Sequence, residues 1–268
     1  MIKDLTIGQY YPTDSVIHRL DARTKLLSTL MYIIFLFLVK NVWGYLAAAL
    51  FLTIVIILSK IPVGYILRGL KAVTVILMIT VAINLFFTPG EVIWSWKFLK
   101  ITLQGATMAF NVAFRLLLLI SATSLMTLCT DTITLTDGME ELMRKLPFIR
   151  HYAHELSMMM SIALRFIPTL SDETERIMKA QKSRGADFES GNLIKRAKSL
   201  IPILVPLFIS AFQRANELAM AMEARCYRGS EGRTRLNELH YTRADIIAYI
   251  VVIAAMAGIF MTRYIPAA

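Results

Sequence analysis

Charged residues are scarce in this sequence. Only 18% of its 268 residues are Asp, Glu, Lys or Arg, whereas 56% are hydrophobic. A soluble domain of this length carries more charge and fewer apolar residues. The composition therefore excludes a water-soluble globular protein and predicts that lipid surrounds part of the chain.

Several absences exclude whole classes of chemistry. The two cysteines, Cys129 and Cys226, are far apart and lack paired spacing, so we expect neither a disulfide framework nor a zinc ribbon. None of the twelve glycines begins a Gly-x4-Gly-Lys-Ser/Thr phosphate loop, and no Gly-x-Ser-x-Gly elbow is present. We therefore expect a non-catalytic chain with no cofactor and no metal, for which any ATP hydrolysis is supplied by other subunits.

The first 25 residues contain no apolar run of the kind found in a cleavable secretory signal. They carry several charged side chains instead: Lys3, Asp4, Asp14, Arg19, Asp21, Arg23 and Lys25. We expect an N-terminus that is retained and lies on the cytoplasmic side of the cell membrane.

Long apolar runs predict an all-α, polytopic membrane protein with five crossings. The runs are Leu26 to Val39, Val42 to Leu58, Ala72 to Thr88, Ile101 to Cys129 and Ile246 to Met261. The first two form a tight helical hairpin around Lys40. Trp94 and Trp96, which precede the fourth run, are typical of anchors at the membrane surface.

Polar residues concentrate between Asp131 and Arg243, which hold 17 of the 29 Lys and Arg and 14 of the 19 Asp and Glu. We divide the chain into a membrane domain (1–130), a helical cytoplasmic region (131–243) and a last transmembrane helix (244–268). Two apolar stretches inside the middle region, 156–170 and 199–213, contain proline and are expected to lie in the membrane interface rather than cross it.

The formal net charge of +10 is compatible with nucleic acid, anionic lipid or the positive-inside bias of membrane proteins. The apolar runs favour the last two. We expect a lipid bilayer as a partner and no nucleic acid.

A short pattern occurs twice in the middle region. In each copy an alanine lies four residues before an arginine, and small residues flank that arginine. The first copy comprises Ala180, Ser183, Arg184 and Gly185, and the second comprises Ala221, Ala224, Arg225 and Cys226. Residues four apart share a helix face, so each alanine lets the helix approach a partner closely beside its arginine.

Both copies are typical of helix ends. Gly185 can adopt the left-handed conformation that stops a helix, which would leave Arg184 in the final turn. In the second copy Gly229 is expected to be the stop, so Arg228 is an alternative to Arg225. A guanidinium gives a bidentate bond to a carboxylate, so two such ends are suited to docking into two similar partners. Alternatively, the arginines cap their own helices or bind anionic head groups.

Three segments of the chain resemble the transmembrane coupling subunit (T component) of energy-coupling factor (ECF) transporters, a family that includes the cobalt-transport permeases. The segments are Arg19-Leu-Asp-Ala-Arg-Thr-Lys25, Gln181-Lys-Ser-Arg-Gly-Ala-Asp-Phe188 and Ala221-Met-Glu-Ala-Arg-Cys-Tyr-Arg-Gly229. The last two are similar to the family's two Ala-Arg-Gly motifs, and each departs from that tripeptide at one position.

The resemblance implies a subunit of an ABC-type importer for a vitamin or micronutrient. Its partners would be two ABC-type ATPase subunits and a small substrate-binding membrane protein (S component). Arg184 and Arg225 would then enter grooves on the ATPases. Methionines on adjacent helices would contact the substrate-binding partner, because thioether side chains adapt to changing surfaces, or would simply pack the core. They are Met158, Met159, Met160, Met220 and Met222.

Two competing hypotheses remain. A self-contained secondary carrier or channel would use Arg115, Asn84 and Asn111 along a path, although the apolar runs contain no acidic residue. An intramembrane metal enzyme would use His151 and His154, which are three residues apart on one helix face but have no third ligand nearby in the sequence.

Overall fold

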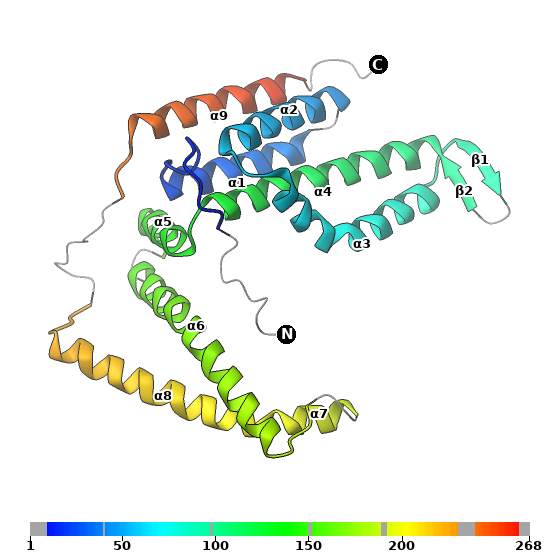
Figure 1. Cartoon of the computed structure of the whole chain (residues 1–268). Helices are drawn as coiled ribbons and strands as arrows, with labels where there is room; N and C mark the ends of the chain where they lie inside the picture. Colours follow the sequence, from blue (N-terminus) through cyan, green and yellow to red (C-terminus); the bar gives the residue numbers. More distant parts are fainter. Residues whose placement is uncertain are drawn as a thin grey trace. The chain divides into compact units, whose positions relative to one another are not determined.

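The computed structural model describes residues 10–39, 41–96, 99–149, 152–188, 192–229 and 239–262, and their fold is almost entirely helical (Figure 1). The helices are α1 (Ala22–Leu38), α2 (Val42–Ser59), α3 (Val63–Phe87), α4 (Leu103–Cys129), α5 (Thr132–Lys145), α6 (Ala153–Ser183), α7 (Leu193–Ser199), α8 (Ile201–Ala224) and α9 (Arg243–Met261). A two-stranded hairpin, β1 (Val92–Trp96) and β2 (Leu99–Thr102), joins α3 to α4. The predicted all-α polytopic class is confirmed, with this hairpin as an addition.

The chain divides into two compact units. One consists of residues 8–138 with 238–268 and is called the bundle unit here. The other consists mainly of residues 139–237 and is called the arm unit. The bundle unit contains α1 to α4 and α9, and the arm unit contains α6, α7 and α8.

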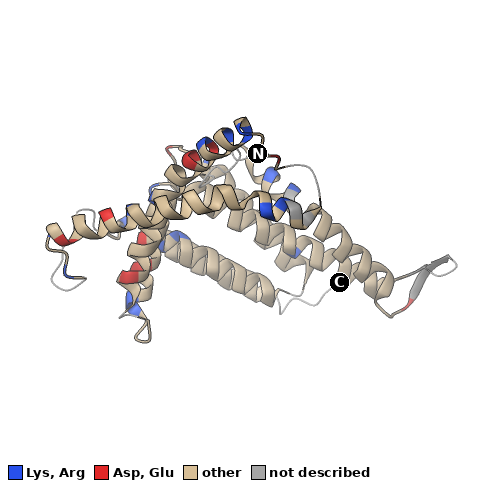
Figure 2. Cartoon of the chain, turned by 90° about the horizontal axis from the view of Figure 1, so that it is seen from below, with Lys and Arg blue, Asp and Glu red and all other residues tan. Residues whose placement is uncertain are grey.

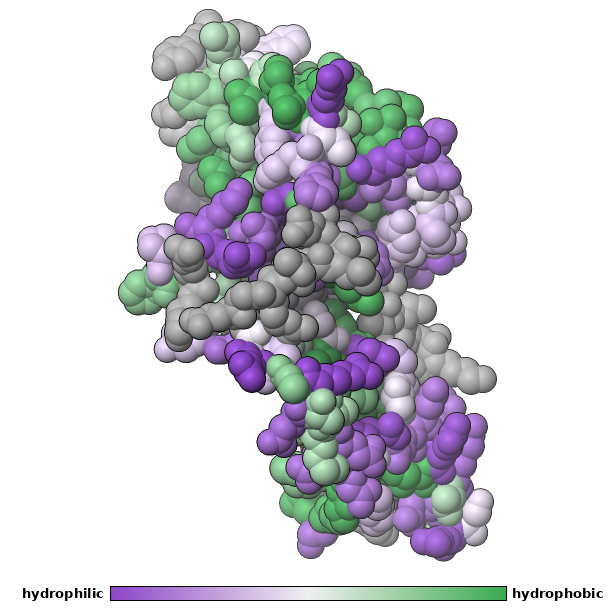
Figure 3. All heavy atoms as spheres, turned by 90° about the vertical axis from the view of Figure 1, so that its left-hand side faces the viewer, coloured by the Kyte–Doolittle hydropathy of each residue, from purple (hydrophilic) through white to green (hydrophobic). Residues whose placement is uncertain are grey.

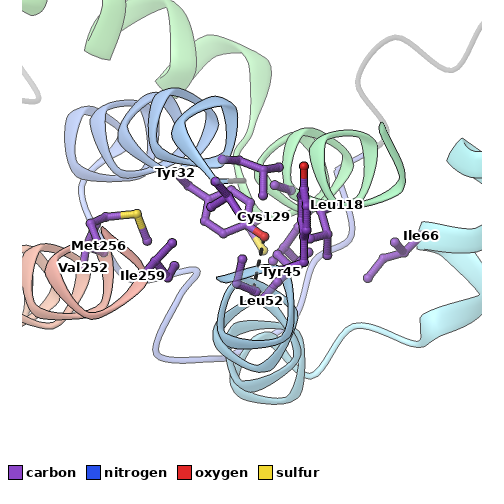
Figure 4. Packing of buried hydrophobic residues seen from close by; sticks show 14 of the residues in the cluster. Tyr32, Tyr45, Leu52, Ile66, Leu118, Cys129, Val252, Met256 and Ile259 are labelled. Atoms are coloured by element: carbon purple, nitrogen blue, oxygen red, sulfur yellow. Dashed lines mark hydrogen bonds between the residues drawn. The ribbon is translucent and has the colours of Figure 1, made fainter. Parts of the chain in front are cut away.

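The bundle unit is held together by apolar packing among α1, α2, α4 and α9, while α3 packs along α4. Tyr45 and Met256 of α9, each 1% exposed, belong to its core (Figure 4). Leu36 is equally buried. The hydroxyl of Tyr32 donates to the carbonyl of Ala48, so a polar group inside the core has a partner.

Small residues allow α3 and α4 to pack closely. A Cβ atom added at Gly105 of α4 would lie 3.0 Å from the carbonyl oxygens of Asn84 and Leu85 in α3. Glycine at such a contact brings two helix backbones together, as is common within membranes. The glycine therefore fixes how closely this helix pair can approach.

Four helical segments are long and apolar enough to cross a membrane: Val42–Ser59, Leu103–Cys129, Arg196–Ala224 and Arg243–Met261. A fifth crossing would be α3, whose segments Val63–Lys71 and Val73–Phe87 meet at a bend of 61°. Figure 2 shows long stretches of helix without charged residues. These helices agree with a multi-pass membrane protein.

Two elements differ from the five predicted crossings. The first predicted crossing corresponds to α1, which has only 17 residues and falls just short of those four segments in length. The stretch 199–213, expected in the membrane interface, belongs to a longer helical segment that meets the length and hydropathy of a crossing. The apolar stretch alone is shorter than a membrane crossing requires, but α8 continues beyond it to Ala224.

The strand that contains Trp94 and Trp96 pairs antiparallel with residues 99–102, with a shift of register between Val92 and Trp94. The sequence alone predicts that these tryptophans anchor the chain at the membrane surface and lead directly into the fourth apolar run. The side chains of residues 92–100 lie outside the described part of the structure, so anchoring by these tryptophans stays a prediction.

A buried polar cluster joins three helix ends of the bundle unit. The Arg23 guanidinium lies 2.7 Å from the Asp21 carboxylate. Asp245 accepts from the Asp21 amide at 2.8 Å and closes a capping box at the start of α9. The Lys25 ammonium donates to the carbonyl of Cys129 at 2.9 Å, at the end of α4. The charged residues at the N-cap and first turn of α1 therefore have a structural role in this unit.

Candidate functional site

The first Ala-Arg-Gly-like motif forms the end of α6. Arg184 is the C-cap residue, and Gly185 follows with φ +86°. The amide of Gly185 donates to the carbonyl of Lys182 at 3.0 Å, and that of Ala186 donates to Gln181 at 3.0 Å. These two bonds define a Schellman motif, in which a left-handed residue reverses the chain. The helix stop expected at Gly185 is confirmed.

The second motif ends α8 in the same way. Arg225 is the C-cap residue, and Cys226 follows with φ +56°. The amide of Cys226 donates to the carbonyl of Glu223 at 2.9 Å, and that of Tyr227 donates to Met222 at 3.0 Å. Both bonds of the Schellman motif are again present.

The stop expected at Gly229 is therefore wrong. Gly229 does have a positive φ of +85°, but α8 has already ended at Ala224. Cys226 takes the left-handed conformation at the position that Gly185 occupies in the first copy. Arg228 lies beyond the cap, and only Arg225 occupies the position equivalent to Arg184.

The two helix ends present equivalent surfaces. Arg184 and Arg225 are both solvent-exposed C-cap residues, and so are the small residues at the last helical position, Ser183 and Ala224. Ala180 and Ala221, one turn before each arginine, are exposed as well. Each end can therefore offer a guanidinium beside a nearly flat patch of helix to another molecule.

The two helices that carry these ends pack against each other around a polar contact, called the crossing here. The Arg214 guanidinium of α8 lies 2.9 Å from the Glu173 carboxylate of α6. A hydrogen bond from Ser210, one turn before Arg214, and then the Arg214 contact itself lower the pKa of Glu173. Two side chains from one face of α8 thus hold a single carboxylate of α6.

A second contact between α6 and the end of α8 was not predicted from the sequence. The Tyr227 hydroxyl lies 3.2 Å from His154 Nε2 and donates to Met158 Sδ at 3.0 Å. The other ring nitrogen of His154 lies 3.3 Å from the buried Glu140 carboxylate of α5. Tyr227 lies in the second arginine motif and His154 in the histidine pair, but the two are 73 positions apart, so only the fold identifies the contact.

The same contact changes the interpretation of the histidine pair. His154 has a carboxylate and a phenol as partners, while His151 lies outside the described residues. Among the residues that the structure describes, no group of three His, Cys, Asp or Glu side chains is placed to hold a metal ion.

The five methionines differ in exposure. Met159 and Met220 are 55% and 62% exposed, and Met160 is 39% exposed. Met158 and Met222 are half-buried, and Met158 accepts the Tyr227 hydrogen bond. Three of the five are thus open to a partner. The face in Figure 3 shows hydrophobic and hydrophilic residues side by side on the arm unit.

Two of the three polar side chains proposed for a carrier path, Arg115 and Asn84, donate hydrogen bonds within the protein. Arg115 donates to the Tyr45 hydroxyl at 2.8 Å and to the carbonyl of Val39 at 3.2 Å, at the turn between α1 and α2. Asn84 donates to the carbonyl of Thr80 within α3. Asn111 is half-buried on α4. Arg115 therefore tethers a helical hairpin, which weakens the carrier hypothesis.

Comparison with known proteins identifies the family. Residues 13–236 match the model of the cobalt transport protein family, CbiQ. The energy-coupling factor transporter transmembrane protein EcfT of Ruminiclostridium cellulolyticum is 53% identical over 265 residues, 99% of each chain. The proteins of the same name from Acidaminococcus fermentans and Streptococcus thermophilus are 51% identical over 268 residues and 46% identical over 251 residues. The former match covers 100% of both chains, the latter 93% of this chain and 95% of its relative.

These matches confirm the resemblance found in the sequence, and the chain belongs to the family of energy-coupling factor transporter transmembrane proteins.

Proposed function

We propose that this chain is the non-catalytic coupling subunit of an ECF-type importer and that Arg184 and Arg225 are its contacts with two ABC-type ATPase subunits. ATP binding moves the two ATPases and thereby the two helix ends. The movement then reaches the membrane helices and a small substrate-binding partner that carries a vitamin or another micronutrient. The chain lies in the cell membrane with its N-terminus and both arginines on the cytoplasmic side. On this proposal the segment 196–224, although long and apolar enough to cross, lies in the membrane interface, since a crossing would separate the two arginines.

The observation that carries this proposal is the equivalence of the two helix ends. The same two capping hydrogen bonds set the same backbone geometry around two exposed arginines that are 41 positions apart. An arginine that only capped its own helix would not need an identical neighbourhood at both sites. Two identical presentations are suited to two similar or identical partners.

The direct test replaces each arginine by glutamate, singly and together. An anchor arginine at an interface typically contributes about 2 kcal/mol, so each single variant should bind the ATPases roughly 30-fold more weakly. The double variant should neither co-purify with ATPases nor support uptake. Arg165→Glu, an exposed position on the same helix as Arg184, is the matched control.

Arg228→Glu separates the two candidate anchors of the second motif. Retained ATPase binding in this variant, together with loss in Arg225→Glu, supports the assignment to Arg225. Uptake and co-purification that survive the Arg184→Glu, Arg225→Glu double substitution contradict the whole proposal.

We further propose that methionines of α6 and α8 contact the substrate-binding partner. Only 6% of the apolar window of residues 196–224 is buried within the chain, which leaves a large apolar surface for lipid or another protein. Met159→Asp or Met220→Asp should reduce co-purification of the substrate-binding partner and leave ATPase binding intact. Loss of both partners would instead indicate a folding defect.

A further inference from the structure

The distance between the two arginine-bearing ends depends on the angle at which α6 and α8 cross. Glu173 precedes Arg184 by eleven residues, and Arg214 precedes Arg225 by eleven residues. At 1.5 Å per residue, each end is therefore about 16 Å from the crossing. Two arms of equal length share one pivot, so their angle alone sets the separation of their ends.

Packing around one crossing point limits the angle between two helices only loosely, whereas a further contact far from that point fixes it more firmly. The hydroxyl of Tyr227 supplies it by contacting His154 and Met158, which are one turn apart at the start of α6. Tyr227 is also bound to the end of α8 through the hydrogen bond from its amide to Met222. Its ring therefore follows the position of the α8 end.

These contacts close a triangle. One side is α6 between residues 154 and 173, about 28 Å of helix, and another is the α8 arm beyond Arg214. The third side is the contact between Tyr227 and His154. His154 is held in turn by the buried carboxylate of Glu140 on α5. A closed triangle has a fixed angle, whereas two crossed helices alone can rotate.

The direction of the effect follows from the continuity of α6. This helix runs without interruption from Ala153 to Ser183, so its start and its Arg184 end lie on opposite sides of the crossing. Tyr227 holds the α8 end toward the start of α6 and therefore away from Arg184. Release of Tyr227 would let the two arginines approach each other.

We propose that Tyr227 is a positioning residue whose hydroxyl contact with His154 and Met158 holds the two arginine-bearing helix ends apart. The contact breaks when the ATPases bring the ends together, and it re-forms when they separate. This inference rests on the proposed function, because it assigns a coupling role to the separation of the two ends.

The first experiment measures that separation in the full-length chain in lipid nanodiscs. Spin labels are placed on the natural, exposed Cys226 and on Lys182→Cys, while Cys129 is only 2% exposed and stays unlabelled. Tyr227→Phe removes the hydroxyl and keeps the ring and the backbone cap. The distance distribution should broaden and shift to shorter values, and Tyr10→Phe, in the bundle unit, should leave it unchanged.

A double-mutant cycle tests whether the contact with His154 is responsible. His154→Ala should cause a similar shift to that of Tyr227→Phe, and the two substitutions together should add little to either one. Additive effects would overturn the assignment, because they would mean that the two side chains act independently.

The second experiment uses the assembled transporter. Tyr227→Phe should still co-purify with the ATPases, since both arginines are intact, while substrate imported per ATP hydrolysed should fall on the order of fivefold, the factor for one lost hydrogen bond. Loss of ATPase binding would make Tyr227 an interface residue and overturn the proposal, as would an unchanged distance distribution. The distance measurement needs no partner, so its outcome is separate from the fate of the proposed function.

Discussion

The backbone at Cys226 is the residue-scale feature on which the second helix end depends. A left-handed conformation costs an L-amino acid on the order of 1 kcal/mol, and glycine avoids that cost. Cys226 adopts it nevertheless, with φ +56°, because both capping hydrogen bonds of α8 require a chain reversal there. A cysteine gives no sequence signal for this conformation, which is why Gly229 seemed the better stop.

Substitutions at the two equivalent positions should have opposite effects. Gly185→Ala should destabilise the end of α6 by about 1 kcal/mol, since no atom lies within 4 Å of the added Cβ and only backbone strain remains. Cys226→Gly should stabilise the end of α8 by a similar amount. Amide hydrogen exchange over the last turn of each helix measures both. Faster exchange in Cys226→Gly would contradict the strain argument.

His18 makes the segment before α1 sensitive to pH. Its Nε2–H donates to the carbonyl of Tyr11 at 3.1 Å, and its Nδ1 lies 2.7 Å from the Ser15 hydroxyl, which can donate to it when the ring is neutral. Burial is the main cause that lowers the pKa of His18 from 6.5. The stabilisation is therefore present above pH 6.5 and is lost as the pH falls through the lowered value.

Hydrogen exchange of residues 11–20, corrected for the intrinsic effect of pH, should accordingly increase between pH 7.5 and pH 5. His18→Gln removes the titrating group and should remove most of this pH dependence. An unchanged profile in that variant would show that another group is responsible.

At the scale of elements, sequence patterns located most helices but not their lengths. The predicted crossing 246–261 lies within α9, and the predicted pair 26–39 and 42–58 corresponds closely to α1 and α2. The apolar stretch 199–213 continues into a charged helical pattern, and α8 accordingly extends to Ala224 because no helix breaker intervenes. Apolar runs define where a helix contacts lipid, whereas breakers and caps define where it ends.

The crossing of α6 and α8 should weaken in acid. The pKa of Glu173 is lowered, chiefly by its hydrogen bond with Ser210 and then by Arg214, so the ion pair is complete above the ordinary glutamate value of 4.5. It is lost only as the pH falls below 4.5, through the lowered pKa. Spin-label distances across the crossing should therefore stay constant from pH 7 to pH 5 and broaden below that range.

Reversing the charges tests the same contact at neutral pH. Glu173→Arg and Arg214→Glu should each broaden the distance distribution, because each places like charges together, and the double substitution should restore it. Broad distances in the double variant would mean that the ion pair does not hold the crossing. Arg165→Glu, an exposed position on α6, is the matched control.

At the scale of the whole molecule, the sequence predicted the helical membrane class, the family and both arginine motifs. It did not predict the contacts among distant residues that hold each unit together. His154 was considered as a metal ligand, yet it contacts Tyr227, 73 positions away. Asp245 bonds to Asp21 across 224 positions. Local patterns specify helices and caps, whereas such pairings depend on how the helices pack.

The two units should consequently respond differently to substitution. The buried ammonium of Lys25 donates to the carbonyls of Cys129 and His18, and Lys25→Ala would leave both acceptors unpaired at a cost of about 3 kcal/mol. Thermal unfolding in detergent should shift to markedly lower temperature, and less protein should reach the membrane. The Arg184→Glu, Arg225→Glu variant should unfold at the temperature of the natural protein, because both side chains are exposed, and yet fail to bind ATPases. If that double variant were the less stable of the two, the arginines would serve folding rather than partner binding.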